Sequence, residues 1–129
     1  MIVVDTNVIA YLFVPGDRTS AAEALRRRDT EWAAPLLWRS EFRNMLATLI
    51  RLGRIELPTA QAIQEQAEQL LAPLEFALDS GTVLGLAATS GCSAYDCEFV
   101  ALADFLDVPL VSADRKLKAR FGKRVRLLS

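Results

Sequence analysis

Two acidic residues follow directly on apolar runs that are typical of short buried strands. Asp5 comes after Ile2–Val4, and Asp114 comes just after Pro109–Ser112. In a sheet of parallel strands the ligand-binding crevice lies beyond the carboxyl ends of the strands, so both carboxylates could share it. Each could instead cap the helix expected to follow it, because aspartate is a favoured N-cap residue. Both interpretations are open at this point.

Glu41 occupies an unexpected position in the segment 36–52, whose apolar residues recur at helical spacing. It lies on the same stripe as Trp38, although a solvated glutamate would be expected among the arginines of the opposite stripe. Burying an unpaired carboxylate is costly, so Glu41 requires a cation, a proton or a water-filled crevice. The alternative is an ion pair at the protein rim with Arg39 or Arg43.

Asp96 precedes Phe99 and Val100 by three and four residues, which predicts that it faces inward on a helix over residues 94–106. The alternative is a capping box, since Ser93 and Asp96 have the spacing of that motif. Taken alone, Asp96 is explained either by helix capping or by a role in a site.

Four carboxylates that a sheet brings together would need compensation. Charges a few Å apart repel by roughly 1–4 kcal/mol per pair at effective dielectric constants between about 80 and 20, and a divalent cation removes this repulsion. Oxygen donors suit Mg²⁺ or Mn²⁺ rather than zinc. The chain has no histidine, which excludes Ser-His-Asp and Cys-His mechanisms, and its two cysteines, Cys92 and Cys97, argue against a structural zinc site.

The order of the elements predicts an α/β fold, a three-layer sandwich with a central parallel sheet of about five strands flanked by helices. Runs typical of strands lie at residues 2–4, 32–34, 74–78, 109–112 and 125–128. Segments with helical periodicity lie at residues 8–13, 20–28, 36–52, 59–71, 82–89, 94–106 and 115–121. With 129 residues, no repeat and no linker, the chain is expected to form a single domain over residues 1–129.

Positive charge is concentrated at the end of the chain. Seven of its 15 Lys and Arg residues follow Asp114, with no acid among them. Next to a metal-carboxylate crevice they could contact phosphates, with the arginines of segment 36–52 as a second wall. A solvated basic helix is the alternative. The candidate phosphate contacts are Arg39, Arg43, Arg115, Lys116, Lys118 and Arg120.

The sequence shows no signal for secretion or for a membrane span. Its longest uncharged stretch, residues 80–95, has 16 residues and three glycines, which is too short for a bilayer. The amino terminus has no positively charged region before Asp5. These observations predict a cytoplasmic protein that does not bind a membrane.

Four short motifs, DTNVI, SEFRNML, SAYDCEFVALA and LVSADRKL, follow one another along the whole chain, and each contains one of the four acids. In order and spacing they resemble the PIN-domain ribonucleases, and among these the VapC-type toxins of toxin-antitoxin pairs. The resemblance implies a PIN-like fold with an acidic pocket for Mg²⁺ or Mn²⁺. The implied catalytic acids are Asp5, Glu41, Asp96 and Asp114, and the implied supporting residues are Thr6, Asn7 and Ser112. Ser112 stands where that family commonly has threonine, and it keeps the hydroxyl.

The activity that the resemblance implies is hydrolysis of RNA phosphodiesters by a Mg²⁺- or Mn²⁺-dependent endoribonuclease, the toxin of a toxin-antitoxin pair. Asp5, Asp96 and Asp114 would hold the metal ion, and Glu41 would orient the attacking water or hold the metal. The basic residues would then contact the RNA substrate. The resemblance also implies a cognate antitoxin protein, which blocks the pocket, and a homodimer.

Two other functions are open. A receiver-like signalling domain also places clustered acids and Mg²⁺ on a doubly wound sheet, but it requires an early pair of acids, which this chain lacks, and a phospho-acceptor aspartate, for which Asp79 alone is available. A non-catalytic PIN scaffold that binds RNA or a protein partner is the stronger alternative. Such a scaffold is expected to lose acids, whereas all four are present here.

Overall fold

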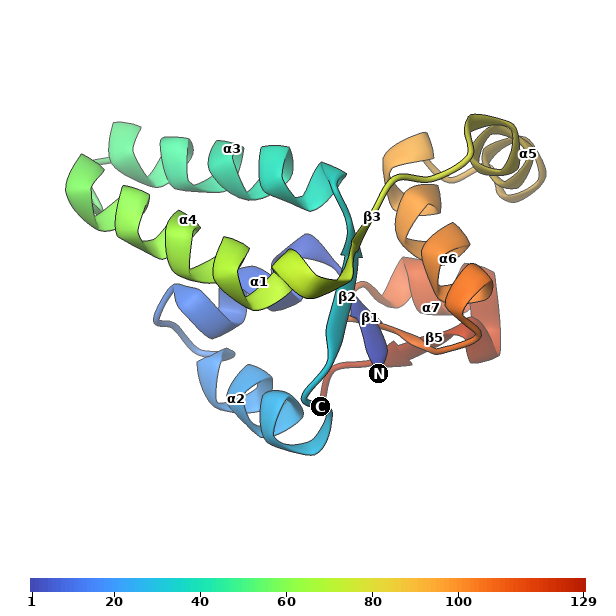
Figure 1. The fold of residues 1–129 in the computed structure, drawn as a ribbon, viewed down its shortest axis with the longest axis horizontal. Coiled ribbons are helices and arrows are strands. Elements are labelled where there is room, and N and C mark those ends of the chain that lie inside the picture. The colour runs from blue at the N-terminus through green and yellow to red at the C-terminus, as the bar shows by residue number, and fades with distance from the viewer.

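Five short strands form one parallel sheet in the computed structural model, which describes residues 1–129 (Figure 1). The strands are β1 (Ile2–Val4), β2 (Trp32–Pro35), β3 (Glu75–Phe76), β4 (Leu110–Ser112) and β5 (Val125–Leu127). Their order across the sheet is β3-β2-β1-β4-β5, and every neighbouring pair is parallel. The predicted α/β fold is confirmed. The third strand is shorter than predicted, because only Glu75 and Phe76 pair with β2.

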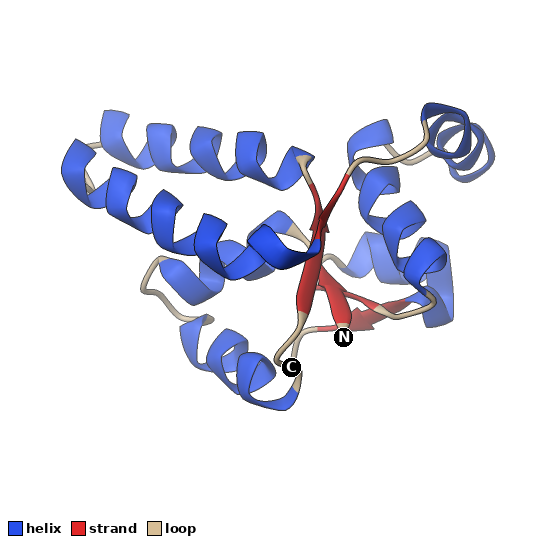
Figure 2. Ribbon diagram, viewed as in Figure 1, coloured by secondary structure: helices blue, strands red, loops and turns tan.

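Seven helices cover the two faces of the sheet. They are α1 (Thr6–Phe13), α2 (Thr19–Arg28), α3 (Leu37–Arg51), α4 (Leu57–Leu71), α5 (Ser80–Ser90), α6 (Ala94–Leu106) and α7 (Arg115–Phe121). In Figure 1, α1 to α4 lie on one side of the sheet and α5 to α7 on the other, and Figure 2 shows the strands as the middle layer of three. Two 3₁₀ turns, η1 (Ala72–Leu74) and η2 (Gly122–Arg124), were not predicted. A helix both long and apolar enough to cross a membrane is absent.

Side-chain caps explain why two helices begin earlier than predicted. The Asp5 carboxylate accepts a hydrogen bond from the Val8 N–H at 3.0 Å, so α1 begins at Thr6 rather than at residue 8. The Asp79 carboxylate accepts one from the Thr82 N–H at 2.9 Å, so α5 begins two residues before its predicted start. The bounds of α6 and α7 agree with the prediction.

The three central strands are buried along their whole length. All residues of β1, β2 and β4 are buried, as expected for parallel strands with helices on both faces. Trp38 and Phe42 of α3 are fully buried beside the sheet, with their ring centroids 6.1 Å apart. This packing fixes α3, the helix that carries Glu41, against the core.

Asp5 and Asp114 follow β1 and β4, the two neighbouring strands between which the strand order of the sheet reverses direction. From β1 the chain proceeds outward to β2 and β3, and it then returns to the other side of β1 to form β4. Val4 pairs with Val111, and the Asp5 N–H donates to the Val111 carbonyl at 3.3 Å. The carboxyl ends of β1 and β4 therefore lie side by side, which is where open α/β sheets bind ligands.

An ion pair attaches the short edge strand β3 to α3. The Glu75 carboxylate, whose side chain is 7% exposed, accepts bonds from Arg39 Nε, Arg39 Nη2 and Trp38 Nε1, each at 2.7 Å. Arg39 also contacts Glu68 of α4 at 3.0 Å. The hydrogen bonds from Arg39 hold the pKa of the Glu75 carboxyl below its usual value, although partial burial opposes this effect.

We expect Arg39→Met to lower the free energy of unfolding by roughly 3 kcal/mol, because it leaves a nearly buried carboxylate without its cation. The measurement is urea denaturation at neutral pH. Arg39→Met combined with Glu75→Gln should recover part of the loss, since the uncompensated charge is then removed as well.

Arg43→Met is the matched control. Arg43 is 57% exposed and approaches Glu68 only to 3.9 Å, so its loss should change stability by less than about 0.5 kcal/mol. Equal losses for Arg39→Met and Arg43→Met would contradict the role given to the Glu75 pair.

Candidate active site

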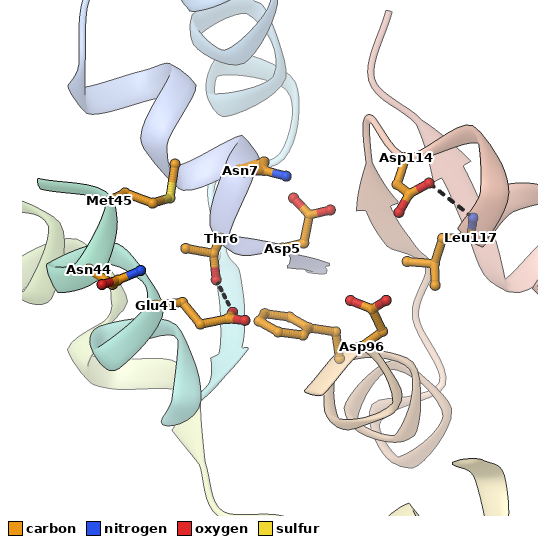
Figure 3. Close-up of a pocket in the computed structure, with 10 residues that line it drawn as sticks. Asp5, Thr6, Asn7, Glu41, Asn44, Met45, Asp96, Asp114 and Leu117 are labelled. Carbon is orange, nitrogen blue, oxygen red and sulfur yellow. Dashed lines mark hydrogen bonds between the residues drawn. The ribbon is translucent and has the colours of Figure 1, made fainter. Parts of the chain in front are cut away.

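A pocket of about 300 Å³ lies at the carboxyl edge of the sheet, and all four acids predicted from the sequence line it (Figure 3). The lining residues are Asp5, Thr6, Asn7, Glu41, Asn44, Met45, Asp96, Phe99, Asp114 and Leu117. Figure 3 shows Asp5, Asp96 and Asp114 on one side of the pocket and Glu41, from α3, on the other. Four segments far apart in the sequence therefore each bring a carboxylate to the same place.

Two of these acids are also the N-caps of helices. The Oδ1 atom of Asp5 accepts a hydrogen bond from the Val8 N–H at the start of α1. The Oδ1 atom of Asp114 accepts bonds from the N–H groups of Lys116 at 2.8 Å and Leu117 at 3.3 Å at the start of α7. The two interpretations of these aspartates are therefore compatible, because each caps a helix and lines the pocket.

Asp96 lies in the first turn of α6 and is exposed at the mouth of the pocket. Its N–H donates to Ser93 Oγ at 3.0 Å, which is one half of the capping box that the sequence suggests. Asp96 lies on the pocket side of α6 together with Phe99, which agrees with the predicted direction. It is exposed rather than buried, because the buried part of the helix begins only at Cys97.

Glu41 is held by a side chain from another element. Thr6, which is 6% exposed, donates its hydroxyl to Glu41 Oε1 at 2.6 Å. The alternative of a rim ion pair is excluded, because Arg39 pairs with Glu75 and Glu68, and Arg43 approaches only Glu68. Glu41 thus faces the pocket with a hydroxyl as its hydrogen-bond partner and without a cation.

Ser112 lies beneath the pocket and is hydrogen-bonded to the backbone of one of its acids. It is fully buried at the end of β4, and its Oγ accepts a hydrogen bond from the Asp114 N–H at 2.9 Å. Burial raises the pKa of the Asp5 carboxyl, and the side chain of Ser112 lowers it by a smaller amount. Of the three supporting residues implied by the resemblance, Thr6 and Asn7 line the pocket, and Ser112 fixes Asp114 from below.

The electrostatics of the pocket favour added positive charge. Burial raises the pKa of Asp5 from 3.8 to about 6, and the charges of Asp96 and Asp114 act in the same direction, while hydrogen bonds oppose the change. Partial desolvation, followed by the charge of Asp114, raises the pKa of Asp96. The neighbouring carboxylates are therefore not fully compensated by the protein itself.

The donor atoms of the pocket suit a hard divalent cation. The pocket is lined by carboxylate, hydroxyl and amide oxygens. Such oxygen atoms are the ligands of Mg²⁺ and Mn²⁺. As the side chains stand, no group of three or more acids or cysteines is arranged so that it could hold a metal ion by itself. Mg²⁺ commonly binds through one or two carboxylates and retains several waters, so this spacing is compatible with it. The assignment of Asp5, Asp96 and Asp114 as metal ligands stays a prediction.

The sequence did not identify four residues that line the pocket, although a simple signal was available. Three of them follow an acid by three residues, since Asn44 follows Glu41, Phe99 follows Asp96 and Leu117 follows Asp114. Side chains three or four positions apart share one face of a helix. The fourth, Met45, follows Glu41 by four. Glu41, Asp96 and Asp114 therefore each bring a residue of the next helical turn into the pocket, whereas Asp5 does not.

The six basic residues named from the sequence are not equally available. Arg39 is occupied by Glu75 and Glu68, and Lys118 Nζ donates to the carbonyls of Gly122 at 3.0 Å and Val125 at 2.8 Å.

The other four basic residues are more exposed. Arg43 and Arg120 each have one long contact, at 3.9 Å and 3.5 Å. Arg115 and Lys116 are exposed at the start of α7, directly after the pocket residue Asp114, and they form no ion pair within the chain.

Comparisons with known proteins agree with this arrangement. The chain is 29% identical over 123 residues to Ribonuclease VapC3 of Pyrobaculum aerophilum, covering 93% of this chain and 94% of that protein. Its fold is similar to the crystal structure of PAE2754 from the same organism, with a TM-score of 0.78, 21% identity, and coverage of 98% of this chain and 90% of that one. It is also similar to a toxin-antitoxin complex from Klebsiella pneumoniae, with a TM-score of 0.69, 17% identity, and coverage of 98% and 96%. The family model for the PIN domain matches residues 2–121, and the chain therefore belongs to the PIN-domain family.

Proposed function

We propose that this chain is a divalent-metal-dependent endoribonuclease, and that residues 1–129 are a single PIN-like nuclease domain. The observation that carries the proposal is the convergence of Asp5, Glu41, Asp96 and Asp114 on one pocket at the carboxyl edge of the sheet. Family membership and the similarity to a protein named Ribonuclease VapC3 support RNA as the substrate. The chain has no histidine, so its acid-base chemistry runs on carboxylates.

In this proposal the acids divide into two roles. Asp5, Asp96 and Asp114 hold Mg²⁺ or Mn²⁺, directly or through water, on the side of the pocket where they are grouped. When bound, the cation supplies neutralisation of phosphate charge and a more acidic water. Glu41 accepts a hydrogen bond from the attacking water through its second carboxylate oxygen, because its Oε1 is already occupied by Thr6. Ser112 keeps Asp114 in place through the Asp114 N–H.

The substrate approaches along the start of α7 in this proposal. Arg115 and Lys116 have no partner within the chain and adjoin Asp114, so they are the strongest candidates for phosphate contacts. Arg43 and Arg120 are secondary candidates. Arg39 and Lys118 are assigned no RNA contact, because their hydrogen bonds stabilise the fold.

We assign the protein the role of toxin in a toxin-antitoxin pair, with a cognate antitoxin protein and a homodimeric assembly as partners. The support is the likeness to a protein named Ribonuclease VapC3 and to a solved toxin-antitoxin complex. A basic side chain of the antitoxin could occupy the acidic pocket, because the carboxylates there lack a cationic partner within the chain. We propose the cytoplasm as the site of action, because the proposed substrate is RNA.

The test of the activity is cleavage of labelled total RNA by the purified chain in Mg²⁺ or Mn²⁺. We expect discrete fragments with metal, none in EDTA, and a loss of roughly 100-fold in Asp96→Asn, because a ligand of the cation is weakened. Asp104→Asn is the matched control, since Asp104 lies on the same helix and pairs with Arg124 outside the pocket.

Equal cleavage by Asp96→Asn and Asp104→Asn, or cleavage that persists in EDTA, would overturn the proposed mechanism. If a folded, antitoxin-free preparation showed no metal-dependent cleavage at all, the non-catalytic PIN scaffold would be the better description of the chain.

Asp5→Asn should make the metal-free protein more stable at pH 7.5. The pKa of Asp5 is about 6 in the folded protein and 3.8 when unperturbed, so its ionisation disfavours folding by up to about 3 kcal/mol above pH 6. Stability is lost as the pH rises from about 4 to about 6, the window in which the unfolded chain is ionised and the folded chain is not. Asparagine keeps the N-cap of α1 and removes this cost.

The measurement is thermal or urea unfolding in EDTA at pH 7.5 and at pH 4. At pH 4 the difference between the variant and the wild type should fall to a small fraction of its value at pH 7.5, because Asp5 is then protonated in the folded chain and about half ionised in the unfolded chain. Addition of Mg²⁺ should then stabilise the wild type more than the variant. A variant that is less stable than the wild type at pH 7.5 would show that Asp5 acts as a structural hydrogen-bonding group.

A further inference from the structure

The two cysteines of the chain lie at the junction of α5 and α6, next to a pocket acid. Cys92 is in the three-residue connection between the helices, and Cys97 is in the first turn of α6, directly after Asp96. Both are free thiols; Cys92 is partly exposed, and Cys97 is 0% exposed. Neither thiol lines the pocket, so the proposed reaction does not use them.

The positions of these cysteines relative to the helix bring them together. Ser93 is the N-cap of α6, so Cys92 precedes the cap and Cys97 is the fourth residue of the helix. Side chains at these two positions face each other and commonly form a contact that fixes how the chain enters the helix. Here both of these positions are cysteines, and Cys92 packs against the cluster that contains Cys97.

Short contacts connect the two residues in the structure. Cys97 Sγ lies 3.9 Å from the Cys92 carbonyl oxygen. The hydroxyl of Ser90 touches both, since it accepts a hydrogen bond from the Cys92 N–H at 3.1 Å and lies 3.7 Å from Cys97 Sγ. Cys92 also packs against the small apolar cluster of Val83, Cys97 and Ala101. The side chain of Cys97 therefore already lies against the backbone of Cys92.

We propose that Cys92 and Cys97 are a modification site, at which a low-molecular-weight disulfide such as oxidised glutathione converts them to a reversible intramolecular disulfide. The accessible Cys92 loses its proton and attacks the external disulfide, which releases one thiol and leaves a mixed disulfide. Cys97 then loses its proton and attacks the Cys92 sulfur, which releases the second thiol. Two protein thiols are oxidised by two electrons, and one external disulfide is reduced to two thiols.

The disulfide also changes the position of a pocket acid, and this consequence rests on the proposed function. A disulfide requires a sulfur-sulfur distance of about 2.05 Å and Cα atoms within about 7 Å of each other, so its closure would fix the connection to the first turn of α6. Asp96 belongs to that turn, and its N–H is bonded to Ser93, between the two cysteines. In this proposal, closure of the disulfide shifts the Asp96 carboxylate relative to Asp5 and Asp114.

The first experiment detects the bond itself. The folded chain is incubated with oxidised glutathione, unreacted thiols are alkylated under denaturing conditions, and the intact mass is measured. We expect a monomer that has lost two hydrogens and takes up no alkylating reagent, and that returns to two alkylated thiols after dithiothreitol. Cys92→Ser should form no internal bond, and Cys97→Ala should stop at the glutathione adduct of Cys92.

The second experiment compares RNA cleavage by the oxidised and reduced forms. Displacement of a reacting group by about 1 Å can reduce a rate on the order of 100-fold, so we expect a loss of this size that dithiothreitol restores. Cys92→Ser should keep its activity in oxidised glutathione. If the reduced wild type cleaves no RNA, the proposed function has failed, while the mass measurement still decides whether the disulfide forms.

Two results would overturn the modification site. One is a wild-type chain that keeps both thiols, or carries only a glutathione adduct, after the treatment. The other is a disulfide between two chains rather than within one. An internal disulfide that leaves cleavage unchanged would refute the displacement of Asp96, because Cys92→Ser provides the undisturbed reference.

Discussion

Three helix N-termini point at one group of carboxylates, and the rest of the site depends on this arrangement. Helices α1, α6 and α7 all begin at the carboxyl edge of the sheet, with Asp5 and Asp114 as the N-caps of α1 and α7 and Asp96 in the first turn of α6. The unpaired N–H groups at a helix start carry a partial positive charge of roughly half a unit, which stabilises nearby anions. The fold can therefore gather several like charges without a cation. The compensation is incomplete, because the pKa of Asp5 still rises to about 6.

The capping geometry also explains how one residue serves both the fold and the site. Both hydrogen bonds that Asp114 accepts at the start of α7 reach Oδ1, so its second oxygen is left for the pocket. The two oxygens of the Glu41 carboxylate also differ, because Thr6 donates a hydrogen bond only to Oε1 and leaves Oε2 for the pocket. A carboxylate has two oxygens and several lone pairs. Stability and function are thus assigned to different atoms of the same side chain.

The sequence predicted the elements well because each is specified locally. Apolar runs mark the buried strands, and a cap marks the start of α6, so the predicted and observed bounds of that helix agree. Contacts between distant segments were not predictable in this way. Glu75 lies 36 residues from Arg39, and no local pattern pairs them. The exposure of Asp96 was also missed, since helical spacing gives its direction but not where the core ends.

The four acids differ in how firmly the protein holds them. Asp5 and Asp114 are fixed by central strands, Asp114 is also fixed by Ser112, and Glu41 is fixed by Thr6 and by a helix packed through Trp38. Asp96 is exposed, as Asp114 is, but Ser93 binds only its N–H and leaves its carboxylate free of hydrogen bonds within the chain. Asp96 is therefore the acid of the pocket whose carboxylate is least restrained by the protein. The first turn of α6 is therefore the part of the site where binding of an ion and the chemistry of the adjacent thiols would meet.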